Sequence, residues 1–138
     1  MESKILTVGV YDLLHRGHVA LFKRCKEFGG GNNHVIVAVQ DSDVVLKYKP
    51  NTTLLYSTEE RMFMVQAIRY VDEVVVYQSI DEIVKHVAFD ILAVGPDQKH
   101  EGFLKAFDWC ERNGKQVVVM PRTEGISSSE LKAKIKNE

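Results

Sequence analysis

Two histidines three residues apart follow the first apolar run of the chain. The stretch Gly9-Val10-Tyr11-Asp12-Leu13-Leu14-His15-Arg16-Gly17-His18 leads from this run into the start of a helical pattern. Gly17 has no side chain, so a phosphate can approach its backbone, and free N–H groups at a helix start favour an anion. His15 and His18 can donate hydrogen bonds to phosphate oxygens, or they can be ordinary turn and helix residues. A zinc site would need a third ligand, for which only Asp12 lies near in sequence, and we predict no metal held by the protein.

A second polar segment lies near the end of the chain, between an apolar run and another helix start. It reads Pro121-Arg122-Thr123-Glu124-Gly125-Ile126-Ser127-Ser128-Ser129. The planar guanidinium of Arg122 can clamp phosphate oxygens, and the serines offer hydroxyl and backbone N–H donors to the same anion. Helix capping is the structural alternative, and it accounts for one serine but not for Arg122 or for three serines in a row. The segment therefore favours a second phosphate contact.

Short β-branched runs alternate with helical patterns along the whole sequence. Runs of this length and composition are typical of buried strands, which we predict at residues 5–10, 35–40, 74–77, 91–94 and 117–120. Helices are predicted at 18–28, 57–70, 81–87 and 103–112, with a final helix from Ser127. This alternation favours a mostly parallel sheet covered on both faces, with ligands bound beyond the carboxyl ends of the strands.

Local signals mark the ends of several of these elements. Ser57 with Glu60, and Ser127 with Glu130, have the spacing of a capping box. In the final helix, Leu131 and Ile135 are expected to face inward. Residues 41–56 read as one long irregular connection that carries Lys47 and Lys49, which makes it a candidate functional loop.

Composition places the chain among soluble globular domains. It has 138 residues, a formal net charge of -1 and 45% hydrophobic residues, so we expect one domain over residues 1–138 and no nucleic-acid partner. No run approaches the roughly 20 apolar residues of a membrane span, and the start lacks the pattern of a signal peptide. The two cysteines, Cys25 and Cys110, fall inside predicted helices and are expected to be reduced and buried. These features predict a cytoplasmic protein without membrane association.

Three segments together resemble the cytidylyltransferase family, and the similarity covers nearly the whole chain. They are G-V-Y-D-L-L-H-R-G-H at residues 9–18, R-Y-V-D-E-V at 69–74 and R-T-E-G-I-S-S-S at 122–129, in the order and spacing of the family. The resemblance implies a single Rossmann-like three-layer α/β domain with a five-stranded parallel sheet. It also implies a homodimer that transfers CMP from CTP to an alcohol phosphate, with Mg²⁺ or another divalent ion carried by the triphosphate.

The resemblance also implies roles for individual residues. His15, His18 and Arg122 would be catalytic, stabilising charge on the reacting phosphorus. Nucleotide contacts are expected from Gly9, Val10, Tyr11, His15, Gly17, His18, Lys49, Arg122, Thr123, Glu124, Gly125, Ile126, Ser127, Ser128 and Ser129. Acceptor contacts are expected from Asp12, Lys47, Arg69 and Asp97. Without the resemblance, Lys47 and Lys49 read as solvated loop residues, Arg69 as a helix-end arginine and Asp97 as a turn residue.

Glycerol 3-phosphate is the acceptor that the resemblance favours, giving CDP-glycerol for a surface polymer such as teichoic acid or a capsule. Two departures from the family bear on this choice: Val10 replaces a threonine, and the segment 78–82 is short and lacks a tryptophan and a lysine. Phosphocholine or phosphoethanolamine as acceptor, ATP in place of CTP, and a CTP-binding regulatory module without turnover are the alternatives that remain.

Overall fold

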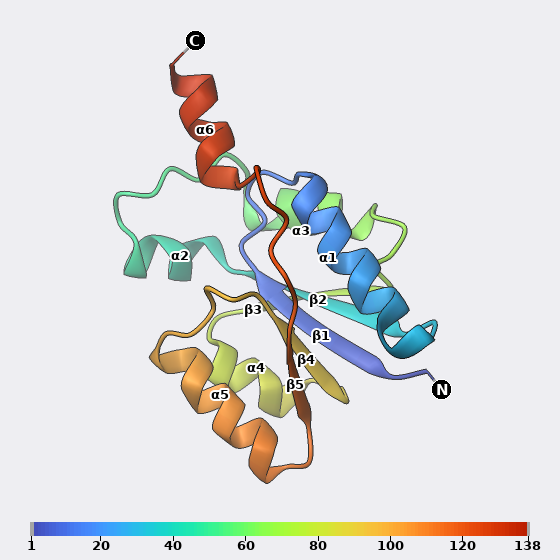
Figure 1. Cartoon of the computed structure of the whole chain (residues 1–138). Coiled ribbons are helices and arrows are strands. Elements are labelled where there is room, and N and C mark those ends of the chain that lie inside the picture. Colours follow the sequence, from blue (N-terminus) through green and yellow to red (C-terminus); the bar gives the residue numbers. More distant parts are fainter. Residues whose placement is uncertain (1, 138) are drawn as a thin grey trace.

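A parallel sheet of five strands forms the centre of the protein. The computed structural model describes residues 2–137, and its strands are β1 (Lys4–Gly9), β2 (His34–Gln40), β3 (Glu73–Tyr77), β4 (Ile91–Val94) and β5 (Gln116–Val119). All neighbouring strands pair in parallel, in the order β3-β2-β1-β4-β5 (Figure 1). The predicted five-stranded parallel sheet is confirmed, and each strand begins and ends within one residue of its predicted bounds.

Helices cover both faces of this sheet, as predicted (Figure 1). On one face, α1 (Arg16–Glu27) and α3 (Thr58–Gln66) bury a core that includes Phe22, Cys25 and Val65. On the other face, α4 (Ile80–His86) and α5 (Glu101–Arg112) bury a second core that includes Val84 and Cys110. A 3-10 turn, η1 (Phe28–Gly30), ends α1. Both cysteines are buried free thiols inside helices, as predicted.

The predicted capping signals are confirmed to different extents. At α3, the Ser57 hydroxyl accepts from the Glu60 N–H at 3.1 Å and the Glu60 carboxylate accepts from the Ser57 N–H at 3.1 Å, which completes the box. At α6 (Ser128–Lys136), the Ser127 hydroxyl accepts from the Glu130 N–H at 3.1 Å, and no return bond is present among the described residues.

Three local expectations are wrong. Residues 41–56 are not irregular throughout, because α2 (Ser42–Tyr48) forms there with the Asp41 carboxylate accepting from the Asp43 N–H. Helix α3 ends at Gln66, four residues before the predicted end. Ile135 is 65% exposed, because α6 projects from the body of the molecule and has no layer to pack against there (Figure 1).

The strand order fixes where a ligand site can form. The chain builds β2 and β3 on one side of β1, and β4 and β5 on the other. The order therefore reverses at β1, and the connections that leave the carboxyl ends of β1 and β4 diverge to opposite sides. No helix among residues 2–137 has the length and apolar character needed to cross a membrane.

Candidate active site

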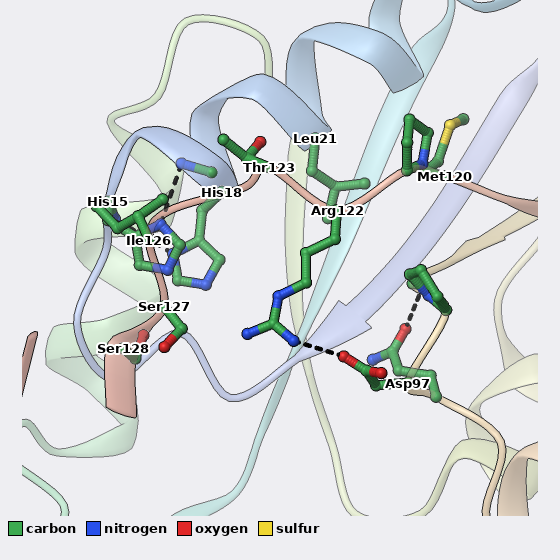
Figure 2. Close-up of a pocket in the computed structure, with 15 residues that line it drawn as sticks. His15, His18, Leu21, Asp97, Met120, Arg122, Thr123, Ile126, Ser127 and Ser128 are labelled. Carbon is green, nitrogen blue, oxygen red and sulfur yellow. Dashed lines mark hydrogen bonds and ion pairs between the residues drawn. The ribbon is translucent and has the colours of Figure 1, made fainter. Parts of the chain in front are cut away.

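A cavity of about 260 Å³ lies beyond the carboxyl ends of β1, β4 and β5 (Figure 2). Three connections line it: the one that leads from β1 into α1, the one that follows β4, and the one that leads from β5 to α6. Its lining residues are His15, Gly17, His18, Leu21, Gly95, Pro96, Asp97, Gln98, Met120, Pro121, Arg122, Thr123, Ile126, Ser127 and Ser128. Both polar segments that the sequence singled out therefore meet in one place.

The two histidines form a stacked pair at the start of α1. Their ring centroids lie 3.9 Å apart, with 30° between the ring planes. The Nδ1 atom of His15 accepts a hydrogen bond from the Gly17 N–H at 3.0 Å, and Nδ1 of His18 accepts from the His15 N–H at 3.2 Å. Because both Nδ1 atoms act as acceptors, each neutral ring carries its proton on Nε2. The Nε2–H group of each ring can therefore donate a hydrogen bond to a ligand.

The environment of this pair keeps both rings neutral. Burial lowers the pKa of His18 to about 4, with a further contribution from His15. Burial also lowers the pKa of His15, helped by the positive charges of Arg16 and Arg122. Gly17 makes the arrangement possible, since a Cβ atom there would lie 2.8 Å from Cε1 of His15. The pair therefore presents neutral N–H donors at neutral pH.

Arg122 and Asp97 meet across the cavity (Figure 2). The Arg122 guanidinium donates to Asp97 Oδ2 at 2.7 Å, with side chains that are 57% and 73% exposed. Gln98 fixes the β4 connection, because it accepts from the Gly95 N–H at 3.0 Å and donates to the Val8 carbonyl at 3.1 Å. An exposed ion pair contributes at most about 1 kcal/mol to stability. A phosphate that enters the cavity can therefore replace Asp97 as the partner of Arg122 with little loss of free energy.

Two arginines of α1 hold the segment between β5 and α6 beside the histidines. Arg24 donates to the Pro121 carbonyl at 2.9 Å, and Arg16 donates to the Glu124 carbonyl at 3.2 Å. Thr123, Ile126, Ser127 and Ser128 consequently line the cavity, as expected for nucleotide contacts. Glu124 and Gly125 line an adjoining hollow that Arg122 shares, whereas Ser129 lies outside both.

The residues that precede His15 pack against the histidine pair and do not line the cavity themselves. Tyr11 is buried, and its ring meets His18 edge-on with 5.2 Å between centroids. Gly9 leaves room for this ring, because a Cβ atom there would lie 2.7 Å from Cζ of Tyr11. The Val10 carbonyl accepts from Arg61 at 2.8 Å. Gly9, Val10 and Tyr11 do not line the cavity, so this placement favours support over the direct nucleotide contact that we expected.

Asp12, which was predicted to contact the acceptor, also does not line the cavity. Its carboxylate is 4% exposed and accepts from the N–H groups of Leu55 and Tyr56 and from Lys132. Burial alone would raise the pKa of Asp12, but Lys132 and the backbone donors outweigh it and hold the pKa below its usual value. The carboxylate is buried and both of its oxygens accept hydrogen bonds, which favours a structural role for Asp12 over the predicted contact with the acceptor.

Three predicted basic residues lie away from the cavity. Arg69 comes just before Asp72, whose N–H bonds to the Val35 carbonyl at the amino end of the sheet. This places Arg69 at the end of the sheet opposite to the cavity, which does not favour the predicted contact with the acceptor. Lys47 lies in the last turn of α2 and Lys49 ends that helix. Both are exposed and neither lines the cavity, although α2 follows the carboxyl end of β2.

Arg61 is fully buried at the carboxyl ends of β1 and β2 and was not among the predicted residues. Its guanidinium donates to the carbonyls of Val10 and Gln40 at 2.8 Å each, and to the Ser42 hydroxyl at 2.7 Å. A signal was present, because Arg61 falls four residues before the buried Val65 on the apolar stripe of α3. A charged residue on a buried stripe indicates a polar network inside the fold.

The fold and the cavity define an α/β protein with a cavity at the carboxyl edge of its sheet, lined by neutral histidine donors and one arginine, which are groups suited to phosphate. The chain belongs to the cytidylyltransferase-like family, whose family model covers residues 6–134. Members of this family that resemble it over nearly their whole length are nucleotidyltransferase enzymes.

Glycerol-3-phosphate cytidylyltransferase of Bacillus subtilis (strain 168) is 36% identical over 138 residues, covering 96% of this chain and 97% of that protein. The protein of the same name from Staphylococcus aureus (strain NCTC 8325 / PS 47) is 34% identical, covering 96% of this chain and 95% of that one. Among solved structures, the lipopolysaccharide core biosynthesis protein from Thermoplasma volcanium GSS1 superposes with a TM-score of 0.68 at 20% identity, over 88% of this chain and 96% of that one. This last likeness shows the fold alone.

Proposed function

We propose that the protein transfers CMP from CTP to glycerol 3-phosphate, giving CDP-glycerol and pyrophosphate. The observation that carries the proposal is the cavity in which the stacked His15–His18 pair faces Arg122 at a helix start. Relatives named for this reaction, at 34–36% identity over nearly the whole chain, support the choice of nucleotide and acceptor. The proposed use of CDP-glycerol is the synthesis of a surface polymer such as teichoic acid or a capsule.

In the proposed reaction, a phosphate oxygen of glycerol 3-phosphate attacks the α-phosphorus of CTP directly. The new P–O bond forms as the bond from the α-phosphorus to the oxygen that bridges to the β-phosphorus breaks, and pyrophosphate leaves with that electron pair. His15 and His18 donate their Nε2–H groups to phosphate oxygens, whose negative charge grows at the five-coordinate centre. Arg122 turns from Asp97 to the phosphates, and Asp97 then faces the hydroxyls of glycerol or ribose.

Mg²⁺ enters this proposal as part of the substrate, bound to the triphosphate of CTP. Among residues 2–137 no group of three His, Cys, Asp or Glu side chains is placed to hold a metal ion. Lys47 and Lys49, exposed on and after α2, are proposed to approach the bound phosphates. We further propose that the protein acts as a cytoplasmic homodimer.

The test is a pyrophosphate-release assay with matched substrate pairs. Purified protein with Mg²⁺ receives CTP or ATP, each with glycerol 3-phosphate, phosphocholine or phosphoethanolamine. We expect release with CTP and glycerol 3-phosphate. Release with another acceptor would keep cytidylyl transfer and refute the acceptor, and release with ATP alone would refute the nucleotide. CTP binding without release from any pair would indicate a regulatory module.

Substitution of His18 tests the assigned chemistry. His18→Ala should lower kcat far more than it weakens CTP binding, because the charge that His18 stabilises grows at the transition state. His86→Ala is the matched control, since His86 is 72% exposed on α4, away from the cavity. Equal losses of turnover and of CTP affinity in His18→Ala would contradict the assignment.

A further inference from the structure

The buried carboxylate of Asp12 joins three segments of the chain. Asp12 lies on the connection from β1 to α1, three residues before His15. Its Oδ1 accepts from the N–H groups of Leu55 and Tyr56 at 3.0 Å each, just before α3. Its Oδ2 accepts from Nζ of Lys132 at 2.6 Å, in the second turn of α6. Lys132 also donates to the Thr53 carbonyl at 3.0 Å.

Helix α6 has few other means of holding its position. None of its residues is buried, and the helix projects from the body of the molecule (Figure 1). Besides the contacts of Lys132, the hydrogen bonds that tie it to the rest of the chain include one from the Ser128 hydroxyl to the Leu13 carbonyl, at 2.9 Å. With little apolar burial to fix it, the orientation of α6 depends on polar contacts to the β1–α1 connection.

These contacts bear directly on the cavity. The first turn of α6 starts at Ser127 and Ser128, which line the cavity, and Lys132 lies one turn beyond Ser128. The side chains of Lys132 and Asp12 are 27% and 4% exposed. This pair is therefore better shielded from water than an exposed ion pair such as Arg122–Asp97. A shielded pair whose carboxylate also accepts backbone N–H groups has a fixed geometry.

We propose that Lys132, which does not line the cavity, is a positioning residue that sets the nucleotide-binding end of the cavity by tying α6 to Asp12. The proposal rests on the proposed function for the identity of the nucleotide. Lys132 holds Ser127 and Ser128 at a fixed distance from His15, because Asp12 and His15 belong to the same short connection. Loss of the tie lets the first turn of α6 move away from the histidines.

The experiment compares Lys132→Met with Lys134→Met and Lys132→Arg. Methionine keeps the length of the stem and removes the charge, and Lys134 offers the same change at an exposed position of the same helix. Hydrogen exchange of the amides of residues 127–132 reports how firmly the first turn of α6 is held, without any ligand. Titration calorimetry with Mg²⁺ and CTP, well below the melting temperature of each variant, reports nucleotide binding.

We expect Lys132→Met to exchange these amides at least tenfold faster and to bind CTP at least fivefold more weakly. Lys134→Met should stay within twofold of the unaltered protein, and Lys132→Arg should restore most of both properties. If the contact were merely structural, Lys132→Met would lower the melting temperature. Its CTP affinity, measured at a temperature at which the variant is folded, would then equal that of the unaltered protein. If Lys132→Met fails to fold, Lys132→Gln provides the same comparison with a neutral donor.

Two results would overturn the proposal. Exchange and CTP affinity of Lys132→Met within twofold of the unaltered protein would show that α6 needs no tie. Equal weakening by Lys132→Met and Lys134→Met would show that helix charge, not position, attracts the nucleotide. Failure of the unaltered protein to bind CTP would instead contradict the proposed function, and the exchange comparison would still decide whether Lys132 positions α6.

Discussion

Mild acid should destabilise this protein through His18. The ring is packed between His15 and Tyr11, and burial holds its pKa at about 4, against an ordinary value of 6.5. Between these two values the unfolded chain binds a proton that the folded protein excludes. Stability therefore rises with pH through this window and is lost as pH falls from 6.5 toward 4.

The size of the effect follows from the two pKa values. One pKa unit corresponds to about 1.4 kcal/mol. The full difference between the two pKa values therefore lowers the free energy of unfolding by about 3 kcal/mol once the pH falls below 4. At pH 5 the loss is about 2 kcal/mol, and partial exposure of His18 sets about 1 kcal/mol as the smallest expected value. The lowered pKa of His15 acts in the same direction.

Urea unfolding at pH 7.5 and pH 5.0 measures this loss, with the fluorescence of Trp109, the single tryptophan, as the probe. The comparison protein is His18→Asn, because the asparagine oxygen can accept from the His15 N–H as Nδ1 does and does not titrate. We expect the unaltered protein to lose about 2 kcal/mol more than His18→Asn between these pH values. His86→Asn, at an exposed histidine, should behave like the unaltered protein.

Equal losses of stability in the unaltered protein and in His18→Asn would refute the reasoning. That result would mean that His18 titrates alike in the folded and unfolded chains. The lowering of the His18 pKa by burial, which keeps the folded protein from binding this proton in mild acid, would then be absent.

Three further substitutions test the packing around the site. Gly17→Ala should lower kcat at least tenfold with an unchanged circular dichroism spectrum, because the new Cβ atom would lie 2.8 Å from the His15 ring; normal turnover would contradict the fixed geometry of that ring. Arg61→Met should lower the free energy of unfolding in urea by about 3 kcal/mol or more, since it leaves buried carbonyls without donors; a loss below about 1 kcal/mol would count against this network. Tyr11→Phe should leave the melting temperature unchanged or raised, because the Tyr11 hydroxyl is buried without a hydrogen-bond partner among residues 2–137, and a clear fall would reveal a partner.

The three central strands of the sheet, β1, β2 and β4, could be predicted from the sequence because they are buried on both faces. Parallel strands of this kind are continuous β-branched runs, such as Val35–Val39, and helical patterns separate them. The complete capping box of Ser57 and Glu60 likewise depends only on neighbouring residues. Helix α2 was not predicted because only Val45 of its residues is buried, so the helix lacks the apolar stripe by which helices are recognised.

The site was predictable where its residues follow strands at the same edge of the sheet. His15, Asp97 and Arg122 each follow a strand, and the topology brings them together. Arg69 could not be placed from the sequence, because a helix end can lie at either edge of a sheet. The tie between Asp12 and Lys132 spans most of the chain, and no local pattern of residues indicates a pairing over that distance.

Product analysis by phosphorus NMR tests the central claim most directly. The protein, Mg²⁺, CTP and glycerol 3-phosphate are incubated together, beside the same mixture with His18→Ala. Cytidylyl transfer predicts CDP-glycerol and pyrophosphate in equal amounts, with formation of both strongly reduced in the variant. Absence of CDP-glycerol in the presence of bound CTP, or equal rates in the two mixtures, would contradict the account.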